Sequence, residues 1–193
     1  NVEGINVIIL YPSKKVSRIQ EKQLTTLGKN IHAIELDGSF DQCQSLVKKA
    51  FLDLQLTKKI KLSSANSINI GRLIPQSFYY FNAYSKLKDK NDVIISVPSG
   101  NFGNITAGLL SKMMGLPIKK FIASTNANKA VPDFIKNGFY KPYQTIQTIS
   151  NAMDVGNPSN IKRIINLYNK IDFLKEDMLS WSFSDNDTIN TIK

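Results

Sequence analysis

The sequence is short of the residues from which metal centres and catalytic triads are built. Its 193 residues include one cysteine, Cys43, and one histidine, His32. A single cysteine excludes an internal disulfide, and one histidine without neighbouring ligands fits neither a Ser/His/Asp triad nor a metal-ligand spacing. We therefore predict no metal site, interpret His32 as a structural residue of a strand, and place Cys43 in a hydrophobic core.

Long apolar runs are also missing. No run reaches the roughly 18 apolar residues of a membrane span, and the first residues, NVEGINVIILYP, lack the basic and apolar regions of a signal peptide. A cytoplasmic protein with no membrane partner fits these features best. Because the chain starts at Asn1 and enters a strand directly, we expect a fragment whose upstream part is missing.

Acidic residues are fewer than basic ones, 15 against 25, which gives a net charge of +10. Such an excess is compatible with a polyanion partner. The basic pairs are short and scattered, however, and no basic run is interleaved with aromatic residues as on a nucleic-acid surface. We expect lysines on solvated faces and no nucleic acid, and we keep a non-catalytic phosphate- or polyanion-binding module as an alternative.

What the sequence does contain is an alternation of strand and helix patterns. Apolar or alternating runs predict strands at residues 7–10, 31–36, 93–97 and 120–123, while helical periodicity predicts helices at residues 17–27, 40–54, about 73–87, 106–114, 130–137 and 161–168. The tail after Phe183 has no clear periodicity. The pattern predicts an α/β fold with open, mostly parallel sheets and flanking helices, and a crossover near residues 58–67 from a first lobe into a second sheet.

The sharpest local feature is SVPSGNFGN at residues 96–104, where a buried strand runs into a turn and then directly into a helix. Gly100 and Gly103 are expected to adopt positive φ and to let the backbone approach a ligand. Free N–H groups at the helix start would then bind an anion such as phosphate. The spacing matches neither a dinucleotide fingerprint nor a Walker loop, and a glycine-rich turn with an asparagine cap explains the residues equally well.

Two further polar segments are candidates for ligand contacts. In SSANSINIGR, residues 63–72, Arg72 is suited to pair with a carboxylate or phosphate, although an Asn/Ser-capped helix is the simpler interpretation. In NAMDVGNPSN, residues 151–160, we interpret Asp154 as an aspartate that stabilises a turn.

Together these segments resemble threonine synthases, most closely those of bacteria and fungi. SSANSINIGRLIPQ, SVPSGNFGNITAGLL, STNANKAVPDF and NAMDVGNPSN occur in the family's order and approximate spacing, and the resemblance covers roughly residues 7–168. It implies a fold-type II pyridoxal-phosphate enzyme, here incomplete, with residues 1–60 in a small moving α/β lobe and residues 61–193 in a large cofactor-binding α/β lobe. The implied lyase reaction converts O-phospho-L-homoserine and water into L-threonine and phosphate.

The resemblance also assigns residues. The phosphate of pyridoxal 5'-phosphate would be held by Gly100, Asn101, Phe102, Gly103 and Asn104, and the substrate by Asn66, Ser67, Asn69 and Arg72. Many relatives carry aspartate at the position of Asn104, and a neutral amide beside a phosphate dianion is physically acceptable.

The family's Schiff-base lysine lies in a motif that this sequence lacks. We therefore nominate no catalytic residue and expect the chain alone to be inactive. The remaining alternative among enzymes is a threonine synthase-like phospho-lyase of the same fold.

Overall fold

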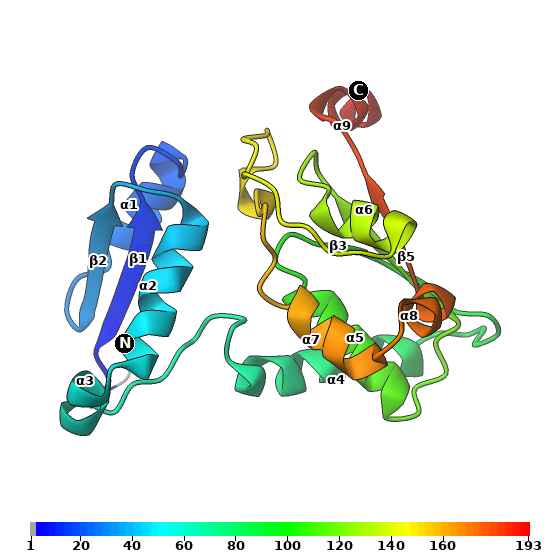
Figure 1. Ribbon diagram of the computed structural model, residues 1–193, viewed down its shortest axis with the longest axis horizontal. Coiled ribbons are helices and arrows are strands. Elements are labelled where there is room, and N and C mark those ends of the chain that lie inside the picture. Colours follow the sequence, from blue (N-terminus) through cyan, green and yellow to red (C-terminus); the bar gives the residue numbers. More distant parts are fainter. Residues whose placement is uncertain (1–2) are drawn as a thin grey trace. The chain divides into compact units, whose positions relative to one another are not determined.

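Two parallel strands form the centre of the first unit, Asn1–Leu62, in the computed structural model, which describes residues 3–193. Strands β1 (Val7–Pro12) and β2 (Ile31–Leu36) pair in register, with Val7 opposite Ile31. Helices α1 (Arg18–Thr25) and α2 (Phe40–Leu52) each begin with a capping box, in which a serine and a glutamine three residues on bond each other's backbone N–H. Figure 1 shows α2 alongside β1.

The predicted helix over residues 40–54 is two helices. Asp53 has an extended backbone, so it ends α2, and its side chain accepts hydrogen bonds from the N–H groups of Gln55 and Leu56 to begin α3 (Leu54–Lys59). Asp53 therefore acts as the N-cap that the periodicity of apolar residues did not reveal. The placement of Cys43 is confirmed, because its side chain is buried on α2.

The second unit, Ser63–Lys193, is built on three parallel strands in the order β3 (Ile94–Pro98), β4 (Lys120–Thr125) and β5 (Met178–Ser182). Its helices are α4 (Leu73–Ser85), α5 (Gly103–Met113), α6 (Ala130–Asn137), α7 (Ile161–Tyr168), α8 (Ile171–Asp177) and α9 (Asp185–Ile192), with 3-10 turns at Ile70–Arg72 and Asn151–Met153. Helices α4, α5, α7 and α8 lie together on one side of the sheet (Figure 1). The prediction of parallel sheets with flanking helices is confirmed.

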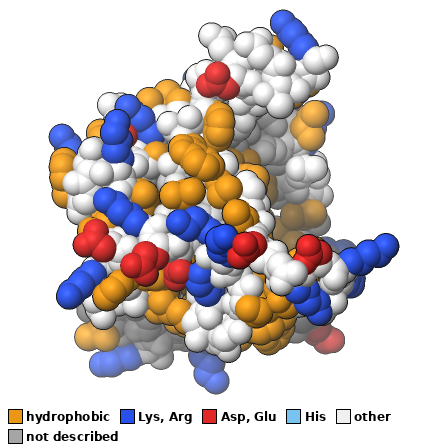
Figure 2. All heavy atoms as spheres, turned by 90° about the vertical axis from the view of Figure 1, so that its right-hand side faces the viewer, with side chains coloured by type: hydrophobic (Ala, Val, Ile, Leu, Met, Phe, Trp, Pro, Cys, Tyr) orange, Lys and Arg blue, Asp and Glu red, His pale blue; other side chains and the backbone are white. Residues whose placement is uncertain are grey.

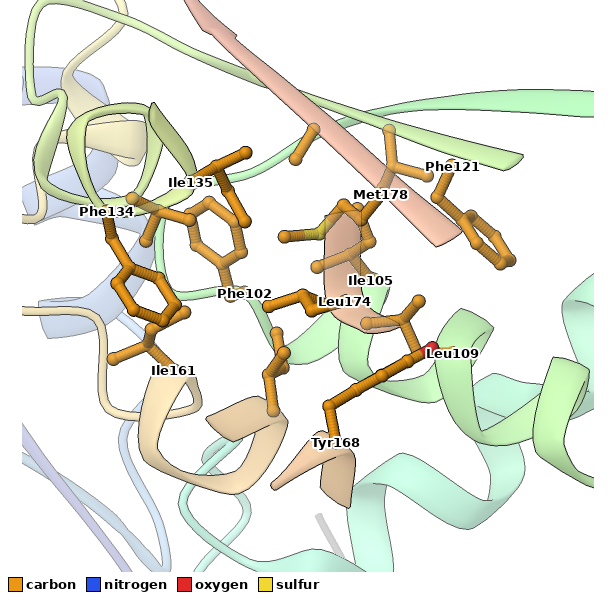
Figure 3. Close-up of a cluster of buried hydrophobic side chains, with 14 of the residues drawn as sticks. Phe102, Ile105, Leu109, Phe121, Phe134, Ile135, Ile161, Tyr168, Leu174 and Met178 are labelled. Atoms are coloured by element: carbon orange, nitrogen blue, oxygen red, sulfur yellow. The ribbon is translucent and has the colours of Figure 1, made fainter. Parts of the chain in front are cut away.

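The hydrophobic core of this unit lies between the sheet and its helices, with buried residues from α5, α6, α7 and α8. Along β4 buried and partly buried residues alternate, so that Phe121, Ala123 and Thr125 face the core. Figure 3 shows the ring of Phe102 among side chains from α6 and α7, such as Phe134 and Ile161. The residue that precedes α5 is therefore anchored by its own side chain.

The C-terminal elements were missed by the sequence analysis. Strand β5 and helix α8 had no predicted counterpart, and the tail after Phe183 forms α9 instead of an irregular segment. The signal for α9 was local: Ser184 and Asp187 form a capping box, which periodicity over a short polar helix does not detect.

Charge on the surface is mixed. On the face shown in Figure 2, Lys and Arg side chains stand among acidic and hydrophobic ones rather than in one block. Within residues 3–193 no helix is long and apolar enough to cross a membrane. The same part of the chain has no group of three His, Cys, Asp or Glu side chains arranged to hold a metal ion.

Candidate functional site

A run of unpaired backbone N–H groups marks the start of α5. Among the described residues, the N–H groups of Gly100, Asn101, Phe102, Gly103 and Asn104 have no hydrogen-bond acceptor, whereas Ser99 N–H still bonds the Ser124 carbonyl (2.8 Å) and Thr106 N–H bonds the Phe102 carbonyl (3.0 Å). We call residues 100–104 the amide loop. Five free donors at the positive end of an 11-residue helix form a binding site for an anion.

The bend in the amide loop is made by Phe102 and not by a glycine. Phe102 has φ 60° and ψ 15°, in the left-handed region, and is 1% exposed. A left-handed residue followed by a right-handed one turns successive N–H groups toward the same side, which is the geometry of an anion-binding nest. This conformation is unfavourable for a non-glycine residue, and burial of the Phe102 ring stabilises it (Figure 3).

The expectation that Gly100 and Gly103 adopt positive φ is wrong, since neither lies in the left-handed region. Glycine is required at both positions because neighbouring segments of the chain pack closely against them. A Cβ on Gly100 would lie 2.9 Å from the Cα atom of Met153, and one on Gly103 would lie 2.9 Å from the Cβ atom of Ser67. Both contacts are shorter than real Cβ contacts, so a side chain at either position would push the amide loop away from the segments that brace it.

The Asn104 side chain braces the amide loop from within. Its Nδ2 donates to the Pro98 carbonyl (2.7 Å) at the end of β3, while its Oδ1 accepts from the Ser99 hydroxyl (3.1 Å) and from Ile105 N–H (2.8 Å). The Asn104 carbonyl accepts a hydrogen bond from the Tyr80 hydroxyl (2.7 Å), whose pKa is raised to about 12 by burial. Asn104 thus has its backbone N–H left for a ligand, while its side chain sets the turn.

The second predicted segment, residues 63–72, lies directly beside the amide loop. Asn101 Nδ2 donates to the Ser67 hydroxyl (2.8 Å), so two segments 34 residues apart are joined. Asn69 uses its side chain within the segment, donating to the Ser64 carbonyl (2.8 Å) and accepting from Gly71 N–H (3.0 Å). Arg72 is exposed, and its Nη1 donates to the Ala65 carbonyl.

Asn66 is the least constrained of the predicted substrate residues. Its Oδ1 accepts from the Ser67 hydroxyl (3.2 Å) and from Ile68 N–H (3.4 Å). The side chain is exposed, and its Nδ2 has no acceptor within residues 3–193. The structure thus brings Ser67 to the amide loop, while Asn66 and Arg72 keep donors that a ligand could use.

Asp154 organises a turn, as its sequence context indicated. Its carboxylate accepts from Asn126 Nδ2 (2.8 Å), from Asn128 Nδ2 (3.3 Å) and from both the N–H (3.0 Å) and the hydroxyl (2.7 Å) of Thr148. These bonds tie the irregular segment after α6 to the residues that follow β4. Because its oxygens are used in this way, Asp154 has a structural role.

Arg163 and Asn160 were not singled out by sequence reasoning, yet they connect the whole site. The guanidinium of Arg163 donates to the Ser67 carbonyl (2.9 Å), to the Ile68 carbonyl and to Asn160 Oδ1. Asn160 Nδ2 in turn donates to the Asn101 carbonyl (3.0 Å). The signal was the pattern NPSNIKR, in which Asn160 is the N-cap of α7 and Arg163 lies three residues further on, in the first turn.

Comparison with known proteins finds similarity to threonine synthases. The chain is 52% identical over 194 residues to threonine synthase of Haemophilus influenzae and 50% identical over 188 residues to that of Escherichia coli. The threonine synthase structure from Escherichia coli superposes with a TM-score of 0.89 at 46% identity, covering 96% of this chain and 44% of that one. A pyridoxal-phosphate-bound threonine synthase from Brucella melitensis gives 0.81 at 31% identity, covering 97% of this chain and 46% of that one.

The chain is homologous to part of threonine synthase. It matches over its full length and spans 46% of the length of the Haemophilus influenzae protein. The resemblance to threonine synthases is thereby confirmed, although no family model matches the chain. Maize serine racemase shares only the fold, with a TM-score of 0.65 at 13% identity over 98% of this chain and 52% of that one, so the predicted fold-type II architecture is confirmed as well.

Proposed function

We propose that the protein carrying this chain is a threonine synthase, which uses pyridoxal 5'-phosphate to convert O-phospho-L-homoserine and water into L-threonine and phosphate. The observation that carries the proposal is the run of five unpaired N–H groups in the amide loop. Homology to threonine synthases over the full chain supports it.

The amide loop fits the phosphate of the cofactor. Residues 96–104 contain no lysine or arginine, so a dianion would be held by backbone N–H groups and by the dipole of α5 instead of by an ion pair. The side chains of Asn101 and Asn104 are engaged in bracing the loop. The binding role proposed for Gly100, Asn101, Phe102, Gly103 and Asn104 is therefore a backbone role.

Pyridoxal phosphate, when bound, supplies an electron sink for carbanions next to the amino group of the substrate. What this chain's residues contribute is orientation. The amide loop would hold the phosphate end, and the hydrogen bond between Asn101 and Ser67 keeps the neighbouring segment beside the loop. We assign substrate binding to Asn66, Ser67, Asn69 and Arg72, with the exposed guanidinium of Arg72 suited to a carboxylate or phosphate of the substrate.

Three wider parts of the proposal concern the whole protein. Residues 1–60 are assigned to a small moving lobe and residues 61–193 to the cofactor lobe. A cytoplasmic location is supported by the single cysteine, which is a buried free thiol. No lysine of this chain is assigned to the Schiff base, because none lies in the family's lysine motif.

The test is the product formed from O-phospho-L-homoserine by the full-length protein loaded with pyridoxal phosphate. A threonine synthase forms L-threonine and phosphate in equal amounts. A phospho-lyase of the same fold releases phosphate without L-threonine, and a non-catalytic binding module releases none. Either of the last two results would contradict the proposal.

A further inference from the structure

Arg163 carries a positive charge that has no acidic partner in the described part of the chain. Among residues 3–193 no carboxylate lies within ion-pair distance of its guanidinium, which bonds only carbonyl and amide oxygens. The side chain is partly buried, and the loss of solvent lowers its pKa below the ordinary arginine value. A partly buried, unpaired cation is unfavourable unless its surroundings supply negative charge or an anion binds nearby.

Two hydrogen bonds, from Arg163 to Asn160 and from Asn160 to the Asn101 carbonyl, connect this charge to the amide loop. We call this chain of hydrogen bonds the relay. Asn160 is completely buried, accepts from Arg163 at Oδ1 and donates from Nδ2 to the Asn101 carbonyl (3.0 Å). That carbonyl belongs to the same peptide group as the N–H of Phe102, one of the five unpaired donors. A hydrogen bond to the oxygen of a peptide strengthens the donor at its nitrogen, because chains of hydrogen bonds polarise one another.

The same relay stabilises the strained part of the loop. The peptide that Asn160 grips leads into Phe102, whose left-handed φ of 60° is unfavourable for a residue with a Cβ atom. Asn101 is held on its side-chain oxygen as well, by the N–H (2.6 Å) and hydroxyl (2.9 Å) of Ser159. Rotation of this peptide would remove the Phe102 N–H from the anion site and break the bond to Asn160.

We propose that Arg163 is a positioning residue for the cofactor's phosphate, which acts through Asn160 to orient and polarise the Asn101–Phe102 peptide. The inference rests on the proposed function only in naming pyridoxal phosphate as the anion. It differs from a purely structural role, in which Arg163 merely clamps the carbonyls of Ser67 and Ile68. A structural clamp affects every ligand of the site equally, whereas the relay affects only ligands that carry the phosphate.

The experiment compares the affinities of the full-length apoprotein for pyridoxal 5'-phosphate and for pyridoxal, which lacks the phosphate. Arg163→Gln is expected to weaken binding of pyridoxal phosphate about tenfold, corresponding to about 1.4 kcal/mol, and to leave the affinity for pyridoxal within about twofold. Lys162→Gln is the matched control, since it removes the same charge from the adjacent, exposed residue and should change neither affinity. An equal loss for both ligands, or no loss in a folded Arg163→Gln protein, would overturn the proposal.

Asn160→Ala keeps the proposal testable if Arg163→Gln does not fold. It removes the bond to the Asn101 carbonyl without changing any charge. It should lower the ratio of the affinity for pyridoxal phosphate to the affinity for pyridoxal, and an unchanged ratio would overturn the relay. Neither result depends on turnover. If wild type forms no L-threonine but the ratio falls in the variants, the proposed reaction fails and the relay stands. If L-threonine is formed and the ratio is constant, only the relay fails.

Discussion

Gly103 offers the most specific test of how the amide loop is packed. A Cβ atom there would lie 2.9 Å from the Cβ atom of Ser67, so in Gly103→Ala the two segments must separate by roughly 0.6 to 1.1 Å to reach ordinary contact. Overpacking of this kind costs about 1–3 kcal/mol. The separation would also stretch the Asn101–Ser67 hydrogen bond of 2.8 Å.

Removing the obstructing atom should restore the loop. In a Ser67→Gly background, Gly103→Ala is expected to cost about 1 kcal/mol less than in wild type, whereas Ser67→Ala keeps the Cβ atom and should give no relief. Urea unfolding of the apoprotein measures these differences as a double-mutant cycle. An equal cost of Gly103→Ala in the wild-type and Ser67→Gly backgrounds would refute the reasoning, because the clash would then not be with Ser67.

Three further predictions concern single residues. Gly100→Ala should weaken pyridoxal-phosphate binding more than Gly103→Ala in equilibrium dialysis, because the new Cβ atom would lie 2.9 Å from the Cα atom of Met153, a backbone atom. A smaller loss of affinity in Gly100→Ala than in Gly103→Ala would contradict this. Burial raises the pKa of Tyr80 from 10.0 to about 12, so ionisation of this hydroxyl removes about 3 kcal/mol of folding stability as the pH rises from 10 through 12. Tyr80→Phe should flatten this part of the stability profile, and an unchanged profile counts against it. Lys29 has φ 57°, a conformation that glycine adopts without strain, so Lys29→Gly should stabilise the fold by about 0.5–1 kcal/mol in thermal unfolding. The control Lys22→Gly, within α1, should destabilise the fold by about 1 kcal/mol.

The sequence predicted the parts of the fold that have a strong apolar pattern. The strand ending at Pro98 and the helix that follows it were visible because a run of apolar residues meets a glycine-rich turn. Strand β5 and helix α8 were not, because the junction at Met178 joins a helix to a strand without a loop, and no turn residue separates them. The short helix α9 depends on a capping box and has few apolar residues to reveal it.

The site shows a similar division between local and long-range information. The position of the amide loop could be predicted, since strand, turn and helix are adjacent in the chain. The reason for its glycines could not, because Gly103 is constrained by Ser67, 36 positions away, and Gly100 by Met153. The role of Arg163 was equally hidden, since it bonds carbonyls 95 and 96 residues earlier.

The most direct test of the central claim is a crystal structure of the full-length protein with pyridoxal phosphate bound. Phosphate oxygens should lie within hydrogen-bond distance, about 2.7–3.2 Å, of the backbone nitrogens of the amide loop, with the side chains of Asn101 and Asn104 still bonded to Ser67 and to the Pro98 carbonyl. A phosphate bound elsewhere, or held by lysine or arginine side chains with the amide loop turned away, would contradict the account.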